Sequence, residues 1–108
     1  MTVTLMWEAR AVPGRGAELL AWARAQRLDA APLRRETFTA PGDRVLVLTW
    51  WEGDGDGVPE LPEPPAELLT RPVHRWRFTS LGVDAPPGGA GPLLGDAAPG
   101  GGAPRGGA

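Results

Sequence analysis

The chain of 108 residues contains no cysteine, no lysine and no long apolar run. Without cysteine, neither a disulfide nor a thiolate metal site can stabilise the fold. No apolar stretch approaches the ~18 residues that a membrane-spanning helix needs. The start, Met1-Thr-Val-Thr-Leu5, lacks the basic region that opens a signal peptide. We therefore expect a cytoplasmic protein with no membrane partner.

Basic charge is spread thinly along the chain. All eleven basic residues are arginine, and thirteen acidic residues give a net charge of −2. Nucleic-acid-binding domains carry a concentrated basic patch, which this pattern lacks, so we expect no nucleic-acid partner. A single histidine, His74, without cysteine makes a poor ligand set for a transition metal. We expect neither a metal nor a cofactor.

Residues 84–108 are dominated by glycine, proline and alanine. A segment of that composition buries too little apolar surface to offset its ordering entropy, which predicts a disordered tail. The folded domain is then residues 1–83. A domain of that size has little buried relative to exposed surface, and association into a homodimer is the simplest way to stabilise it.

Hydrophobic periodicity predicts the elements of this domain. Residues 2–12 alternate as a half-buried strand. We expect further elements in this order: a helix over residues 15–29, a hairpin of strands over residues 33–39 and 44–52, a short helix over residues 65–71, and a strand over residues 73–83. The Pro- and Gly-rich residues 53–65 predict no regular structure.

The order strand–helix–strand–strand–helix–strand is typical of the ferredoxin-like plan, an α+β fold. It places one antiparallel sheet beneath helices that all lie on one face. The other face of the sheet then needs cover. Two such sheets packed face to face would supply that cover in a homodimer.

Two adjacent tryptophans end the most apolar predicted strand. Successive side chains of a strand point to opposite faces, so Trp50 and Trp51 cannot share one core layer. One of them must face a pocket, a covering helix or another subunit. Trp22 lies roughly 100° from the apolar stripe of its helix. We expect it to be half-exposed or covered by another segment.

Two features of the sequence resemble a known family. One is the first strand, which runs into Arg10-Ala-Val-Pro-Gly14 and then a helix; the other is the end of the later strand, Val47-Leu-Thr-Trp-Trp-Glu52. The family is the antibiotic-biosynthesis-monooxygenase-like (ABM-like) group of the dimeric α+β barrel superfamily, and the resemblance covers residues 2–83. That group includes cofactor-independent oxygenases of polycyclic phenols, heme-degrading enzymes, and small isomerases or cyclases. The heme-degrading branch uses an asparagine on the first strand and a histidine on the later helix. This chain has no asparagine, and His74 falls at a strand start, so heme degradation is not expected.

Five tryptophans in so small a domain predict either a planar-ligand pocket between sheet and helix or core and interface packing. The candidate substrate-binding residues are Trp7, Trp22, Trp50, Trp51, Trp76 and Arg75. His74 is the candidate catalytic base, because histidine is the residue type that ordinarily exchanges a proton near neutral pH. The arginines at positions 34, 35, 75 and 77 are expected to pair across strands with Glu8, Glu36 or Glu52, or to bind an anion.

Two functions remain open from the sequence. One is a small ABM-like protein that binds a planar apolar metabolite of secondary metabolism. It would act as a cofactor-independent monooxygenase or a cyclase/isomerase of an aromatic polyketide-like substrate. In that reading an arginine stabilises an enolate or phenolate oxygen. The alternative is a non-catalytic ligand-binding or assembly module whose tryptophans are structural.

Overall fold

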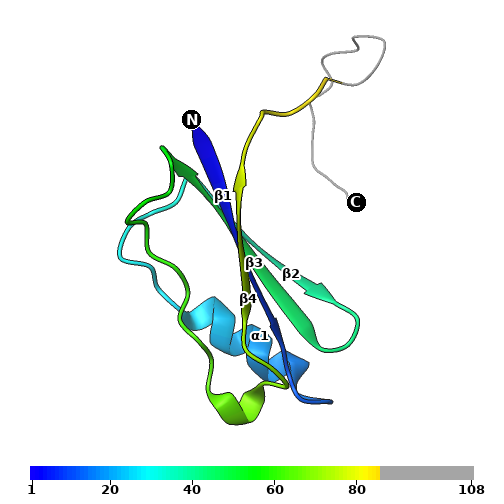
Figure 1. Ribbon diagram of the computed structural model, residues 1–108. Helices are drawn as coiled ribbons and strands as arrows, with labels where there is room; N and C mark the ends of the chain where they lie inside the picture. The colour runs from blue at the N-terminus through cyan, green and yellow to red at the C-terminus, as the bar shows by residue number, and fades with distance from the viewer. Residues whose placement is uncertain (86–108) are drawn as a thin grey trace.

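The computed structural model describes residues 1–85, and the secondary structure of that part follows the expected order (Figure 1). Its elements are β1 (Thr2–Arg10), α1 (Gly16–Ala25), β2 (Arg34–Ala40), β3 (Arg44–Glu52), the 3₁₀ helix η1 (Ala66–Leu68) and β4 (His74–Thr79). No helix of the described part is long and apolar enough to cross a membrane. The predicted tail lies outside the described residues, apart from Asp84 and Ala85.

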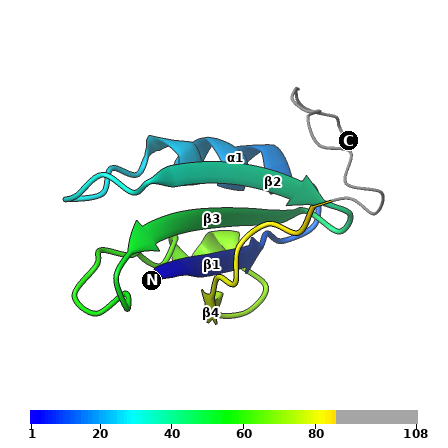
Figure 2. The same ribbon diagram turned by 90° about the horizontal axis from the view of Figure 1, so that it is seen from above.

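The strands form one antiparallel sheet in the order β2-β3-β1-β4, with β1 in the interior (Figure 2). This α+β arrangement is compatible with the predicted ferredoxin-like plan. The last strand is shorter than expected because β1 begins at Thr2 and offers no partner to residues beyond Ser80. Val3 pairs with Thr79, and the final backbone bond joins the Ser80 N–H to the Thr2 carbonyl at 2.8 Å.

The short helix predicted over residues 65–71 is confirmed only in part, because the three-residue 3₁₀ helix η1 forms there in place of an α-helix. Pro64 precedes the segment, Pro65 begins it and Pro72 follows it, which leaves too few residues to offset the cost of nucleating an α-helix. Leu69 instead has an extended backbone and forms a bridge with Ala11, next to the end of β1.

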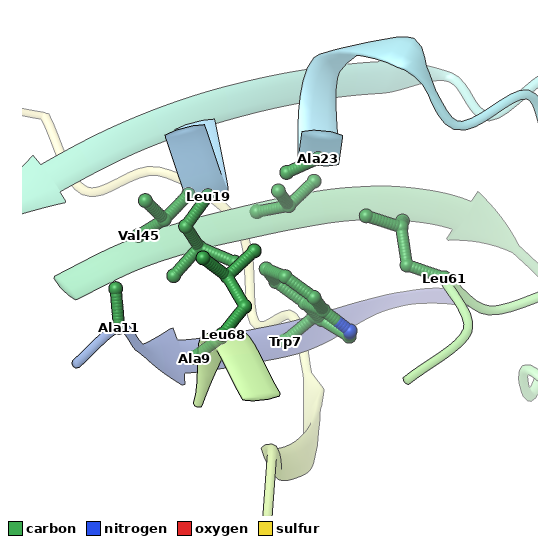
Figure 3. Packing of buried hydrophobic residues seen from close by; sticks show 9 residues of the cluster. Trp7, Ala9, Ala11, Leu19, Ala23, Val45, Leu61 and Leu68 are labelled. Atoms are coloured by element: carbon green, nitrogen blue, oxygen red, sulfur yellow. The ribbon is translucent and has the colours of Figure 1, made fainter. Parts of the chain in front are cut away.

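The main core lies on the face of the sheet that α1 covers. The buried residues of this cluster are Trp7, Ala9, Ala11, Leu19, Ala23, Val45, Val47, Leu61 and Leu68. Figure 3 shows Leu19 and Ala23 from α1, with Leu68 from η1, directed toward the residues of β1 and β3. A smaller cluster of Val3, Leu5 and Trp51 continues the same face. The core face predicted for the first strand is confirmed, since its odd-numbered residues belong to these clusters, but Thr4 and Glu8 on the other face are buried as well.

Residues 53–65, which we call the strap, have no regular secondary structure, as predicted. The strap crosses the same face as α1, at the place where a ferredoxin-like fold would carry its second helix. Leu61 is only 4% exposed and belongs to the main core, while Val58 packs on the smaller cluster. An irregular segment therefore completes a layer that the sequence pattern assigned to a helix.

The opposite face of the sheet, which we call the open face, carries the even-numbered side chains of all four strands. Its members lie in rows across the sheet: Arg34-Trp50-Thr4-Phe78, Glu36-Leu48-Met6-Trp76 and Phe38-Leu46-Glu8-His74. Trp76 is 60% exposed, Phe78 48% and Phe38 38%. Large aromatic side chains exposed together on one sheet face are uncommon in a monomer and are typical of an interaction surface.

Candidate functional site

The structure divides the five tryptophans between the two faces of the sheet. Trp7 and Trp51 point to the α1 side, where Trp22 of α1 also packs, whereas Trp50 and Trp76 belong to the open face. The predicted split of Trp50 and Trp51 is confirmed: Trp51 is 5% exposed and Trp50 is half-buried. The candidate substrate-binding residues therefore do not gather into one cage.

The tryptophans on the α1 side pack as core residues. The rings of Trp7 and Trp22 stack with centroids 6.1 Å apart and planes 19° from parallel, which explains how Trp22 is covered. The Trp7 indole donates from Nε1 to the Pro62 carbonyl at 3.2 Å, and Trp51 donates from Nε1 to Thr49 Oγ1 at 2.8 Å. Both buried indoles thus have partners within the protein, as buried tryptophans require.

The tryptophans on the open face remain accessible. The Arg34 guanidinium carbon lies 5.4 Å from the Trp50 ring centre, within the range of a cation–π interaction. Trp76 meets His74 edge-to-face with centroids 6.2 Å apart. The side chain of His74 is 54% exposed, so its ring stands at the margin of an aromatic surface and remains open to solvent.

A carboxylate lies beside this histidine. Glu8 pairs directly with His74 in the register of β1 and β4, and Glu8 Oε1 lies 3.5 Å from His74 Nδ1. The Glu8 side chain is only 8% exposed, and both of its oxygens accept hydrogen bonds from Arg71 Nη2, at 2.7 and 2.8 Å. Arg71 compensates the charge of a carboxylate that would be costly to bury alone.

Glu8 and Arg71 are not among the site residues predicted from the sequence. The signal for Glu8 was present, since a carboxylate in the middle of a strand shares its face with His74 once β1 and β4 are aligned antiparallel. Arg71 had no comparable signal. It reaches Glu8 only because the irregular chain after η1 returns to the end of β1, where the Thr70 N–H donates to the Arg10 carbonyl at 3.0 Å.

Arg75 lies on the opposite face of the sheet from His74 and is bound to the strap. It donates from Nη1 to the Leu61 carbonyl at 2.7 Å and to Glu60 at 3.2 Å, and its Nη2 lies 3.7 Å from Glu63. A ligand on the open face that meets His74 would therefore not reach Arg75. Arg77 likewise contacts the strap, at Asp56.

Within residues 1–85, none of the ion pairs expected between the arginines of β2 and β4 and Glu8, Glu36 or Glu52 forms across strands. Arg34 does pair with Glu36, at 2.6 Å, but the two residues belong to the same strand. Arg35 donates to backbone carbonyls at the end of α1, and the arginines of β4 pair with acidic residues of the strap. The expectation failed because β4 lies next to β1, and the residues of β1 on the α1 side are apolar. Arg75 and Arg77 of β4 therefore contact the strap instead.

Hollows in the surface lie at η1, at the β2–β3 turn and after α1, and these contain no tryptophan. The first of them is lined in part by Arg71 and Pro72, next to the Glu8 pair. Within residues 1–85, no group of three or more His, Asp or Glu side chains is arranged to hold a metal ion. The sequence expectation that the protein uses no cofactor stays a prediction.

Fold and site together define a small α+β protein with one packed sheet face and one open, aromatic sheet face. Comparisons with protein-family models, curated proteins and solved structures give no significant match to this chain. The resemblance to the ABM-like group therefore stays a prediction, and the candidate site has to be judged on its own geometry.

Proposed function

We propose that the protein binds a flat, largely apolar small molecule on the open face and that His74 moves a proton on that molecule. The observation that carries the proposal is the Glu8–His74 pair beside the exposed ring of Trp76. A histidine at the edge of an accessible aromatic surface can exchange a proton with a planar ligand that stacks on that surface.

The position of Glu8 supports a different role for each ring nitrogen of His74. A carboxylate facing Nδ1, at 3.5 Å, favours the tautomer with the proton on Nδ1. Nε2 is then the acceptor and can take a proton from a phenol or enol. The bond between Arg71 and Glu8 fixes the carboxylate in place, so Glu8 would orient the imidazole and stabilise it once it is protonated.

The reaction class that suits this site is one that begins with loss of a proton from an aromatic polyketide-like substrate. In a cyclase or isomerase, the resulting enolate forms or moves a bond within the substrate and is then reprotonated. In a cofactor-independent monooxygenase, the deprotonated substrate itself donates electrons to O₂. The exposed rings of Trp76 and Phe78, together with Trp50, would support the flat substrate.

The first test is titration with a panel of polycyclic phenols in air, followed by tryptophan fluorescence and by ligand absorbance. We expect saturable quenching and a slow spectral change of the ligand. In His74→Ala, the spectral change should slow by about 100-fold, while quenching and the melting temperature stay close to those of the unsubstituted protein. Trp76→Ala should weaken binding, whereas Trp22→Phe, on the other face, is the matched control.

Each part of the proposal can fail separately. Quenching without any spectral change would retain the binding site and remove the catalytic role of His74. A spectral change that His74→Ala leaves unaffected would assign the proton transfer to another group. If none of the phenols gives a saturable response, the ligand-binding function is wrong.

The exposed aromatic rings of the open face also favour a second candidate, assembly of a homodimer. Phe38, Trp76 and Phe78 are each more than a third exposed and lie on one face. Two copies related by a twofold axis could bury these rings by packing the sheets about 10 Å apart. The dimeric α+β barrel expected from the sequence would have this geometry.

Sedimentation velocity tests this second candidate. We expect a dimer for the unsubstituted chain and a monomer for Trp76→Glu, because an unpaired charge is costly to bury in place of an aromatic ring. Leu81→Glu is the control, since Leu81 is 95% exposed and lies beyond the end of β4. A monomer at all concentrations in the unsubstituted chain would exclude assembly and leave the open face to small ligands.

A further inference from the structure

The strap is attached to the rest of the protein differently from the segments on either side of it. The Gly53 N–H donates to the Met1 carbonyl at 2.6 Å, and the Val12 N–H donates to the Leu68 carbonyl at 2.9 Å. Between these two anchors, within residues 1–85, no backbone–backbone hydrogen bond joins residues 54–64 to another segment. The strap is thus fixed at both ends and held along its length by side chains.

Most of these side-chain contacts come from the two arginines of β4. Arg75 bonds to the Leu61 carbonyl and Glu60, and Arg77 bonds to the Asp54 carbonyl at 3.3 Å and to Asp56 at 3.4 Å. The acidic partners are exposed, since the Asp56 side chain is 80% accessible and that of Glu60 46%. Ion pairs of this kind contribute little to stability and are weakened further by salt.

The surface beneath the first half of the strap is apolar and belongs to the sheet. Gly55, at φ +86°, approaches Val3 so closely that a Cβ there would lie 2.9 Å from Val3 Cγ1. Val58 packs on the cluster formed by Val3, Leu5 and Trp51. Lifting the strap would uncover this cluster without breaking any hydrogen bond between strands. Leu61, buried in the main core, keeps the closed form as the ground state.

We propose that the strap is a cover that opens locally while the sheet and α1 stay folded. Opening exposes the apolar surface of Val3, Leu5 and Trp51, and Arg75 and Arg77 act as the latch that favours closure. The proposal does not depend on the function proposed for the open face, because the strap lies on the opposite face of the sheet.

The absence of cysteine allows a direct test with single thiols in the full chain. Val3→Cys places a thiol beneath the strap and Val45→Cys places one beneath α1, and the two valines are equally buried at 2% and 1% exposure. Local opening requires less free energy than global unfolding, so the thiol at position 3 should react at least about tenfold faster with a thiol reagent.

The latch is tested in the same background. Adding Arg77→Ala to Val3→Cys should raise the labelling rate severalfold. Added salt should also raise the labelling rate of Val3→Cys. Arg34→Ala is the matched control, because it removes an exposed ion pair at the other edge of the sheet and should leave the rate unchanged. Equal labelling at positions 3 and 45, or no response to Arg77→Ala, would overturn the proposal.

Digestion of the unsubstituted chain with a glutamate-specific protease gives an independent check if Val3→Cys does not fold. Cleavage after Glu60 should precede cleavage after the glutamates of β1, α1 and β3, because a protease needs an opened segment. Cleavage in the strap that is no earlier than cleavage elsewhere would show that the strap unfolds only together with the sheet.

Discussion

Arg34 and Arg35 are neighbours in β2, yet they contact different parts of the molecule. Arg35 donates from Nη1 to the Gln26 carbonyl at 2.8 Å and from Nη2 to the Ala23 carbonyl at 2.9 Å. Both carbonyls lie at the C-terminal end of α1, where Gln26 is the capping residue, and the Ala23 carbonyl also accepts a hydrogen bond from the Gln26 N–H at 3.2 Å. Arg34 pairs with exposed Glu36 instead.

This difference predicts unequal effects on stability. We expect Arg35→Ala to lower the free energy of unfolding by about 1–2 kcal/mol, because it removes charge-assisted bonds and a favourable charge at a helix C-terminus. Arg34→Ala should cost about 0.5 kcal/mol or less. Urea denaturation of both variants makes the comparison, and equal losses would contradict the role given to Arg35.

At the scale of single residues, alternation along the strands could be predicted from sequence because it is a local property. It placed Val3, Leu5 and Trp7 on one face and separated Trp50 from Trp51, as the burial confirms. The Glu8–Arg71 bond could not be predicted. It depends on the register of β1 against β4 and on the path of an irregular segment, and neither is encoded by local periodicity.

Within α1, Leu19 and Leu20 also make different contacts, although they are the same residue type. Leu19 is fully buried and packs in the main core, whereas Leu20 is only partly buried at its margin. Leu19→Ala should therefore lower the free energy of unfolding by about 2–4 kcal/mol, and Leu20→Ala by roughly 1 kcal/mol. Thermal and urea unfolding would measure the loss of stability in both variants. A larger loss for Leu20→Ala would mean that α1 is rotated about its axis, with Leu20 rather than Leu19 facing the core.

At the scale of elements, the strands and α1 could be predicted because each has a period and a clear stop signal. The ends were less predictable: α1 begins at Gly16 and ends at Ala25, inside the expected range of 15–29. The helix predicted over residues 65–71 is reduced to the three-residue η1, since a proline at a first helical position favours an α-helix only when enough residues follow to continue it.

At the scale of the whole molecule, the order of elements was sufficient to predict the α+β class and a sheet compatible with the ferredoxin-like plan. What could not be predicted was that the strap would take the position of a second helix. That position is decided by Leu61 entering the core and by the arginines of β4, which are contacts between distant parts of the chain. The stacking of Trp7 on Trp22 likewise depends on tertiary contacts, including the bond from the Trp7 indole to Pro62 in the strap.

The position of β1 in the sheet has a consequence for synthesis. β1 is made before the other strands of its sheet, and its two neighbours are β3 (Arg44–Glu52) and β4 (His74–Thr79). Pairings so distant along the chain form slowly, because a long loop must close before any contact is gained. A nascent chain that ends before residue 74 would leave one edge of β1 unpaired. A chaperone that binds extended apolar segments would find its target there.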